Sequence, residues 1–414
     1  MNETPIKTLL IQGLLLVIVF FTTTFSGAEW ISAKYVFFRD SWMTWKDFRF
    51  ALNFSLPFLL ILTVHEFGHY FVARYHKVKV TLPYYLPLWF GFFPALGLGS
   101  LMLPSIGTAG AVIRIRERLT SKIKFFDIGI AGPLAGFVVA LGVLYYGFTH
   151  LPPKEYIYDI HPEYEYFGED YAAYVYDQDT MVLKKDLEKY GREIPALYPD
   201  TLKLTKDRPM IALGSNLLME FFGNYVAKDP SLVPNQFEMY HYPWIFAGFL
   251  ALFFTALNLL PIGQLDGGHI LYGLLGANRH SIVSKTLFYI LIFYSGLGIL
   301  PLNAPVQDLM WGSFLYMGFL YVSAFKLYPK PINRLTFAVV VFSIHFLLEW
   351  IFPDLRGYSG WLLFVLILGR FIGVEHPPTV ADAPLDPRRQ LLGWLALAVF
   401  ILSFSPRPFI ITGP

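Results

Sequence analysis

The chain has 414 residues, of which 55% are hydrophobic, 18% aromatic and 15% charged. A soluble domain carries about 25% charged residues, and here the apolar residues form blocks of about 20, the length that spans a hydrocarbon core. An ordinary soluble protein is therefore excluded, and we expect a lipid bilayer as partner. The lack of cysteine excludes disulfides, thiol catalysis and cysteine-ligated metals. The formal net charge of +2 gives no sign of nucleic acid, and we expect no such partner.

We predict nine helical membrane spans, and we interpret the first as a retained span rather than a cleaved signal peptide. They are expected near residues 9–27, 51–75, 125–149, 244–263, 283–301, 308–326, 335–352, 360–373 and 390–405. Lys and Arg are concentrated in the loops after the second, fourth, sixth and eighth spans, which indicates that these loops and the N-terminus are cytoplasmic. The sequence therefore predicts a multi-pass protein of a bacterial cytoplasmic (inner) membrane, and it leaves the oligomeric state open.

Two regions lack the character of a span. Residues 78–124 mix Pro, Gly and aromatic residues, and the alternating, β-branched stretch Thr108–Arg116 predicts a strand or hairpin lining a cavity. Residues 150–243 form an acidic extracytoplasmic insert, in which Met210–Ala227 has a helical pattern. The predicted organisation is a first span with its loop (1–50), core spans with the β segment (51–149), the insert (150–243), a further core span (244–280) and additional C-terminal spans (281–414).

The strongest chemical signal is His65-Glu66-Phe-Gly-His69, inside an apolar helical run. Residues four apart share one face of a helix, so both imidazoles can reach a single metal ion. Glu66 lies beside them, where it could take a proton from a water that the metal has made acidic. Ionisable groups within a membrane-embedded helix are expensive and usually functional. This reasoning favours a metal site over two hydrogen-bonded core histidines.

A catalytic zinc ion has three protein ligands and an open position. The candidate third ligand is Asp266, which we expect at the end of the span near 244–263. Pro261 and the pair Gly267-Gly268 are expected to break or bend that helix and let the carboxylate approach the metal. The second and fourth spans run in the same direction, so both motifs lie toward the cytoplasmic side. Asp-Gly-Gly alone would more often mark a loop, but a histidine pair that needs a third ligand reverses this preference.

Four segments in the same order resemble the site-2 protease family of intramembrane metalloproteases. They are His65-Glu66-x-x-His69, Gly107-x-x-Gly110-Ala111, Asp127–Gly136 and Asn258–Gly268. The similarity is to the bacterial and plastid branch without an obvious PDZ domain. It implies an all-α polytopic membrane protein with a site-2 protease-like transmembrane core, a small membrane-associated β element and one extracytoplasmic insert. The C-terminal spans match only loosely.

The resemblance also implies the roles of individual residues. One Zn²⁺ ion would be held by His65, His69 and Asp266, with Glu66 as the general base. Asn258 would bind the substrate backbone or steady the oxyanion. The segment containing Gly107, Gly110 and Ala111 would pair with an unwound substrate as an added strand. The implied activity is cleavage of transmembrane protein substrates in or near their spans, as in regulated intramembrane proteolysis.

Three other functions remain open on sequence grounds. A transmembrane metal-ion transporter also places His and Asp within spans. An inactive, metal-binding relative could act as a membrane chaperone, although the presence of Glu66 argues against it. A different membrane zinc protease could use a glutamate in place of Asp266 as its third ligand.

Overall fold

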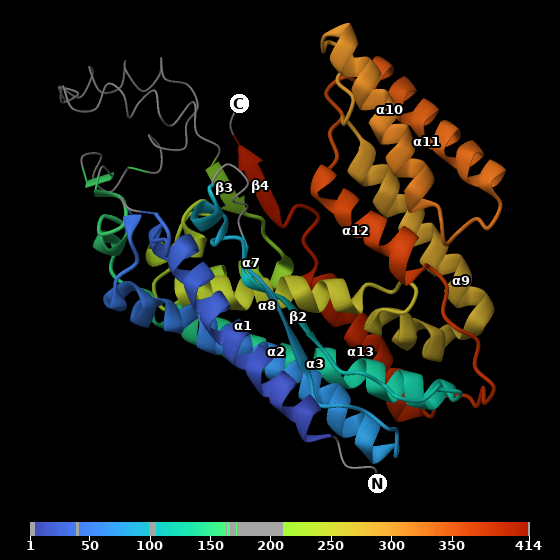
Figure 1. Ribbon diagram of the computed structural model, residues 1–414, viewed down its shortest axis with the longest axis horizontal. Coiled ribbons are helices and arrows are strands. Elements are labelled where there is room, and N and C mark those ends of the chain that lie inside the picture. The colour runs from blue at the N-terminus through green and yellow to red at the C-terminus, as the bar shows by residue number, and fades with distance from the viewer. Residues whose placement is uncertain are drawn as a thin grey trace.

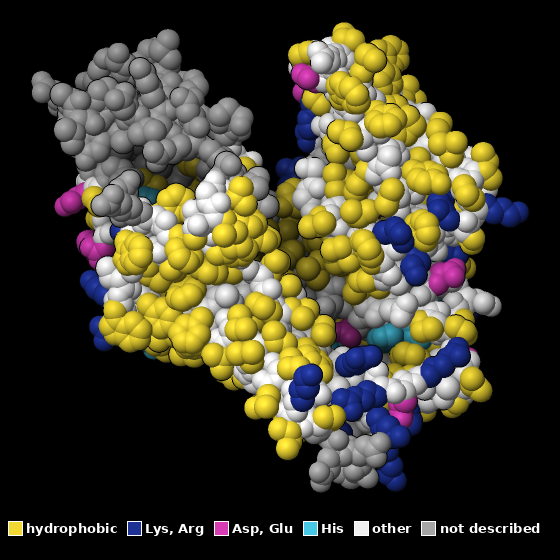
Figure 2. Space-filling model, in the orientation of Figure 1, with side chains coloured by type: hydrophobic (Ala, Val, Ile, Leu, Met, Phe, Trp, Pro, Cys, Tyr) yellow, Lys and Arg dark blue, Asp and Glu magenta, His cyan; other side chains and the backbone are white. Residues whose placement is uncertain are grey.

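The computed structural model describes residues 5–38, 41–98, 105–162, 164, 165, 171 and 210–412. These residues are mostly helical, as the sequence predicts, and they form two groups of helices that diverge from a shared base (Figure 1). Figure 2 shows a deep hollow between the two groups, and it shows Lys and Arg side chains gathered at the end where the N-terminus lies. The predicted all-α membrane fold is therefore confirmed.

The first group contains four apolar helices. They are α1 (Ile6–Ser32), α2 (Trp45–Tyr75), α3 (Lys122–Thr149) and α8 (Pro243–Leu259). A shared core of large side chains, including Phe54, Leu144 and Phe246, lies between α2, α3 and α8. At the start of α2, the Thr44 hydroxyl and the Asp47 carboxylate cap each other's backbone, which fixes where this helix begins.

A two-stranded antiparallel sheet lies against α1. Its strands are β1 (Tyr84–Leu88) and β2 (Gly107–Val112). The short 3₁₀ helix η2 (Phe93–Leu96) follows β1. The Thr22 hydroxyl of α1 donates a hydrogen bond of 2.7 Å to the carbonyl oxygen of Gly107 and so anchors the sheet. The strand predicted within Thr108–Arg116 is therefore present, although it begins at Gly107 and ends at Val112.

The described part of the insert consists of short elements. They are η4 (Lys154–Ile157), β3 (Met210–Leu213), α7 (Leu217–Phe221), the π-helical turn Phe222–Val226, η7 (Pro230–Leu232) and η8 (Met239–His241). The helix predicted over Met210–Ala227 is wrong for residues 210–216, since α7 begins at Leu217. The first four form β3, because an antiparallel partner strand, β4 (Phe409–Thr412), arrives from far along the chain. The Asn216 side chain then caps α7.

The second group is built around α9 (Asp266–Gly296), which has a kink at Gly276. The other elements are α10 (Val306–Ser323), α11 (Pro331–Ile351), η9 (Ser359–Trp361), α12 (Leu362–Leu366), η10 (Ile367–Ile372) and α13 (Pro387–Ser403). α13 returns to the first group, where Ala396 and Val399 pack in one core with Phe126 of α3. Arg389 of α13 also donates two hydrogen bonds of 2.7 Å to the Asp127 carboxylate. These contacts join the two groups at their base.

Among the described helices, α1, α2, α3 and α11 are long and apolar enough to cross a membrane. α8 and the segment Ser359–Ile372 are apolar but shorter. Large apolar side chains on the outer faces of α1 and α11, such as Leu14 and Trp350, are exposed, as expected for a lipid-facing surface. The chain is therefore an integral membrane protein. The other predicted spans, in α9, α10 and α13, stay predictions.

Candidate metal centre

The candidate metal centre includes two histidines on one face of α2. His65 and His69 lie one turn apart, each is only 7% exposed, and their Nε2 atoms are 3.1 Å from each other. The Nδ1–H of His69 donates a hydrogen bond of 2.7 Å to the carbonyl oxygen of Ile128 on α3. In the neutral imidazole that bond leaves the lone pair on Nε2, which is the form that binds a metal ion.

Asp266 reaches the two histidines from the first turn of α9. Its Oδ2 atom lies 3.2 Å from Nε2 of His69 and 3.7 Å from Nε2 of His65. The expectation that Asp266 ends the preceding span is wrong, because α8 stops at Leu259 and a short loop leads to a new helix at Asp266. The N-terminus of a helix stabilises a carboxylate, so this position suits an anionic ligand.

The glycine pair after Asp266 does not break the helix. Gly267 and Gly268 belong to the first turn of α9, and a side chain at either would overlap a carbonyl oxygen, of Leu259 and Gly263 respectively. Their role is therefore to let the start of α9 fold closely back on the loop. The expected break lies before the glycine pair, between Leu259 and Asp266, where Pro261 is found. The close packing of the two glycines then brings the Asp266 carboxylate to the histidines.

The three ligand atoms have the spacing that a metal ion needs. Their separations are 3.1, 3.2 and 3.7 Å. Tetrahedral zinc at 2.0–2.1 Å from each ligand would place them about 3.3–3.4 Å apart. Two imidazole nitrogens and a carboxylate are also the donor types that zinc prefers. The predicted ligands His65, His69 and Asp266 thus meet at one point and fit a zinc ion.

Glu66 and Asn258 both lie beside this point. Glu66 is 6% exposed, and its carboxylate lies close to the backbone of Ile113, just past β2. The Nδ2 atom of Asn258, on α8, is 3.4 Å from Nε2 of His65. A carboxylate and an amide therefore flank the histidine pair, and they arrive from different elements.

The three β2 residues singled out from the sequence lie in different surroundings. Gly107, with φ of +82°, packs against the backbone of α1, and a side chain there would overlap the Thr22 carbonyl. Ala111 is buried in a cluster with Tyr85. Gly110, with φ of +105°, has open space where a side chain would lie. Of the three, only Gly110 has open space at its Cβ position.

Small residues of α3 allow close packing against α2, the helix that carries His65 and His69. A side chain on Gly132 would overlap the His69 ring, one on Gly136 would press on His65, and Gly68 of α2 packs on the backbone of Ala131. Gly132 and Gly136 therefore lie directly against the two histidine ligands.

We expect Gly132→Ala to lower zinc affinity at least about 10-fold, because the new methyl group would displace the His69 ring from its hydrogen bond to Ile128. The measurement is zinc content against a competing chelator. Gly142→Ala is the matched control, since Gly142 lies on the same helix and has open space at its Cβ position. Equal zinc affinity in the two variants would contradict the role given to Gly132.

A second histidine pair, which was not predicted from the sequence, lies beside the centre. His269, three residues after Asp266 on α9, has its Nδ1 atom 2.8 Å from Nε2 of His376. The His376 ring in turn stacks on Tyr272. The spacing of three residues from Asp266 was a usable local signal for His269. Nothing local pointed to His376, which is 107 positions away.

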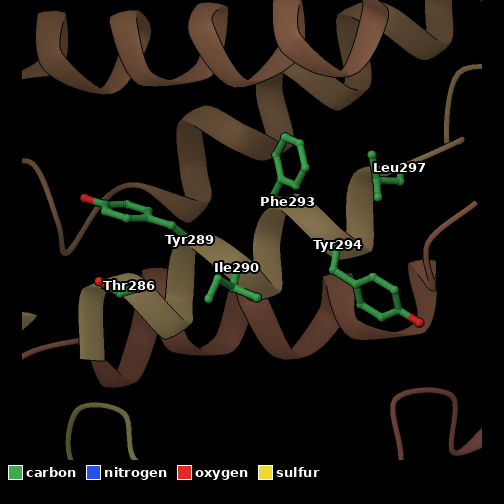
Figure 3. Close-up of a pocket in the computed structure, with 6 residues that line it drawn as sticks. All are labelled: Thr286, Tyr289, Ile290, Phe293, Tyr294 and Leu297. Carbon is green, nitrogen blue, oxygen red and sulfur yellow. The ribbon is translucent and has the colours of Figure 1, made fainter. Parts of the chain in front are cut away.

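A separate pocket of about 440 Å³ lies along the outer half of α9 (Figure 3). Its lining residues are Thr286, Tyr289, Ile290, Phe293 and Tyr294 of this helix and Leu297, which directly follows it. None of them is a residue predicted for the site, and none is a typical zinc ligand. The chemistry of the molecule is therefore to be sought at the histidine pair rather than in this pocket.

The fold and the centre together define a membrane protein with a buried His-His-carboxylate group beside a glutamate, an arrangement typical of metallopeptidases. Residues 53–301 match the family model of peptidase family M50. The match covers more than half of the chain, so the chain belongs to peptidase family M50. The resemblance to site-2 proteases is thereby confirmed.

Plant proteins are among the similar curated sequences. "Probable zinc metalloprotease EGY1, chloroplastic" of Oryza sativa subsp. japonica is 25% identical over 267 residues, 64% of this chain and 34% of the relative. "Probable zinc metalloprotease EGY2, chloroplastic" of Oryza sativa subsp. indica is 24% identical over 327 residues, 79% of this chain and 42% of the relative. The chain thus spans about a third to two fifths of the length of these relatives. No solved structure is significantly similar to it.

Proposed function

We propose that the chain is an intramembrane zinc metalloprotease that hydrolyses peptide bonds in or near the transmembrane segments of membrane-anchored substrates. The observation that carries the proposal is the convergence of His65, His69 and Asp266 within 3.7 Å of one another, with Glu66 alongside. Membership of peptidase family M50 and the zinc metalloprotease names of the plant relatives support the same activity.

Each residue would have a separate task in the reaction. When bound, zinc would supply Lewis acidity, which polarises the scissile carbonyl and makes a water acidic enough to attack at neutral pH. Glu66 would take the proton from that water and return it to the departing amine. Asn258 would donate its amide N–H to the carbonyl oxygen as that oxygen gains negative charge.

The substrate segment would bind in extended form beside β2. A helix hides its carbonyl groups in its own hydrogen bonds, so a helical substrate must unwind before its backbone can be cut. The open space at Gly110 leaves room for a strand to approach. The Glu66 carboxylate lies close to the backbone of Ile113, so the end of β2 is beside the general base. Gly107 and Ala111 would hold β2 in place, and pairing would occur through the backbone.

The proposal includes a setting for this activity. We place the protein in a bacterial cytoplasmic (inner) membrane, with its N-terminus cytoplasmic and the insert on the outer side, where it would act in regulated intramembrane proteolysis. The pairing of β3 with β4 agrees with this topology, because it brings the insert and residues 409–412 to the same side. Six predicted spans lie between β3 and β4. The chain therefore crosses the membrane an even number of times between these strands and returns to the side on which it started.

We expect the purified chain, reconstituted in liposomes, to cut single-span peptides, to lose this activity with a zinc chelator and to regain it when zinc is restored. Mass spectrometry of the products locates the cut. A matched pair of peptides, one with Asn-Gly and one with Leu-Leu at the middle of the span, tests unwinding. The Asn-Gly peptide should be cut faster, because glycine weakens a helix by about 1 kcal/mol.

The same liposomes separate the rival functions. A metal transporter would carry zinc to an internal fluorescent indicator and leave every peptide intact. An inactive relative would bind zinc and peptide without product. Either result in place of cleavage would contradict the proposal.

A further inference from the structure

A second group of metal-type ligands lies in the insert, on residues that the proposed protease reaction does not use. The Nε2 atoms of His161 and His241 are 3.1 Å from each other. The Oε2 atom of Glu238 lies 3.3 Å from Nε2 of His241 and 3.7 Å from Nε2 of His161. This triangle repeats both the donor types and the edge lengths found for His65, His69 and Asp266. It therefore fits the same kind of ion.

The polarity of the group favours a cation at its centre. The Nδ1–H of His241 donates a hydrogen bond of 2.6 Å to the carbonyl oxygen of Ile31, so the Nε2 atom carries a lone pair. That lone pair faces the Glu238 carboxylate, and the two residues are 3% and 2% exposed. Two electron-rich atoms this close and this buried repel each other unless a metal ion or a proton lies between them.

Neighbouring residues support the three ligands as they do in known metal sites. The Tyr164 hydroxyl donates to Oε1 of Glu238 at 3.1 Å, which leaves Oε2 directed toward the histidines. The Tyr156 hydroxyl donates to the carbonyl oxygen of His241 at 2.6 Å. Hydrogen bonds of this kind orient metal ligands and are part of a working site.

We propose that His161, Glu238 and His241 bind a second divalent metal ion of the zinc class. Its role is structural. His161 lies near the start of the insert, whereas Glu238 and His241 lie at its end, so one ion joins both ends. Through the bond from His241 to Ile31, the ion also fastens the insert to the end of α1.

The second ion also fixes the entry into α8. This helix begins at Pro243, two residues after His241. Tyr240 packs edge-to-face on Trp30 of α1, at 5.7 Å between ring centroids. The ion would thus secure α8 at the end opposite to Asn258, without contact with the histidines of α2.

Zinc content per chain, measured by mass spectrometry on the full-length purified protein, tests the proposal. We expect two zinc ions in the wild type, one in His65→Ala/His69→Ala and one in His161→Ala/His241→Ala. The control His150→Ala, which removes an exposed histidine at the end of α3, should keep two. A folded His65→Ala/His69→Ala variant that holds no zinc would overturn the second site. Failure of the protease proposal would remove cleavage or the first ion but leave one zinc ion in His65→Ala/His69→Ala, so the two failures are distinguishable.

A milder substitution guards against misfolding of the alanine variants. In the His65→Ala/His69→Ala background, Glu238→Gln keeps the side-chain shape and can still accept the Tyr164 hydrogen bond. Added zinc should raise the melting temperature of the parent variant and leave that of the Glu238→Gln variant unchanged, because only the parent keeps all three ligands. The absence of a zinc-dependent shift in the parent would overturn the proposal, since a proton would then suffice to hold these side chains together.

Discussion

Glu66→Gln is expected to retain zinc and to lose cleavage by about 10²–10⁴-fold, the range supplied by a positioned general acid or base. The amide has the shape of the carboxylate, and Glu66 is not one of the three residues that would hold the metal, so the fold and the metal ligands should be undisturbed. It cannot take a proton from water. The measurement pairs zinc content with the cleavage rate of one single-span peptide in liposomes.

Glu117→Gln provides the control for this substitution, because Glu117 lies on the exposed loop before α3, away from the histidines. It should keep both zinc and full activity. A Glu66→Gln protein that still cleaves at the wild-type rate would remove Glu66 from the reaction. Loss of zinc in that variant would instead indicate that Glu66 helps to bind the ion.

Asp266→Ala is expected to abolish cleavage because the metal itself is lost. Removing an outer partner of a metal ligand weakens binding about 10–100-fold, and removing one of three direct ligands should weaken it more. The Asp266 carboxylate lies within 3.7 Å of both imidazoles, so the two histidines would be left to hold the ion alone. Zinc competition with a chelator of known affinity measures the change.

The matched control is Asp308→Ala, at an exposed position in the first turn of α10. Both aspartates occupy the start of a helix, so the comparison separates loss of a metal ligand from loss of a favourable helix-end charge. Unchanged zinc affinity in Asp266→Ala would favour the rival protease in which a glutamate completes the site. Zinc lost equally from both variants would point to a general loss of stability.

The part of the centre that could be predicted from sequence is the part fixed by local geometry. His65 and His69 meet because residues four apart share a helix face, and no distant contact is needed to bring them together. Asp266 was predicted because a catalytic zinc ion needs three protein ligands and the two histidines supply only two. Its setting was misjudged, because the reversal between Leu259 and Asp266 depends on how closely Gly267 and Gly268 approach the loop carbonyls.

Contacts between distant segments could not be predicted from the sequence. The pairing of β3 with β4 turned an expected helix at Met210 into a strand, and no local pattern could reveal a partner nearly 200 residues later. The same limit applies to the group formed by His161, Glu238 and His241, since each residue alone is an unremarkable polar side chain in the insert. Span boundaries, by contrast, followed closely from apolar length for α1, α2 and α3.

The pairing of β3 with β4 has a consequence for biosynthesis. Phe409 is separated from Leu213 by 196 positions in the chain. At about 5–20 residues per second, a ribosome needs roughly 10–40 s to make that stretch. During this interval Met210–Leu213 is an unpaired edge, and α8 to α13 must be placed before β4 can close it. Completion of the insert is therefore a late event in assembly, dependent on correct insertion of every helix in between.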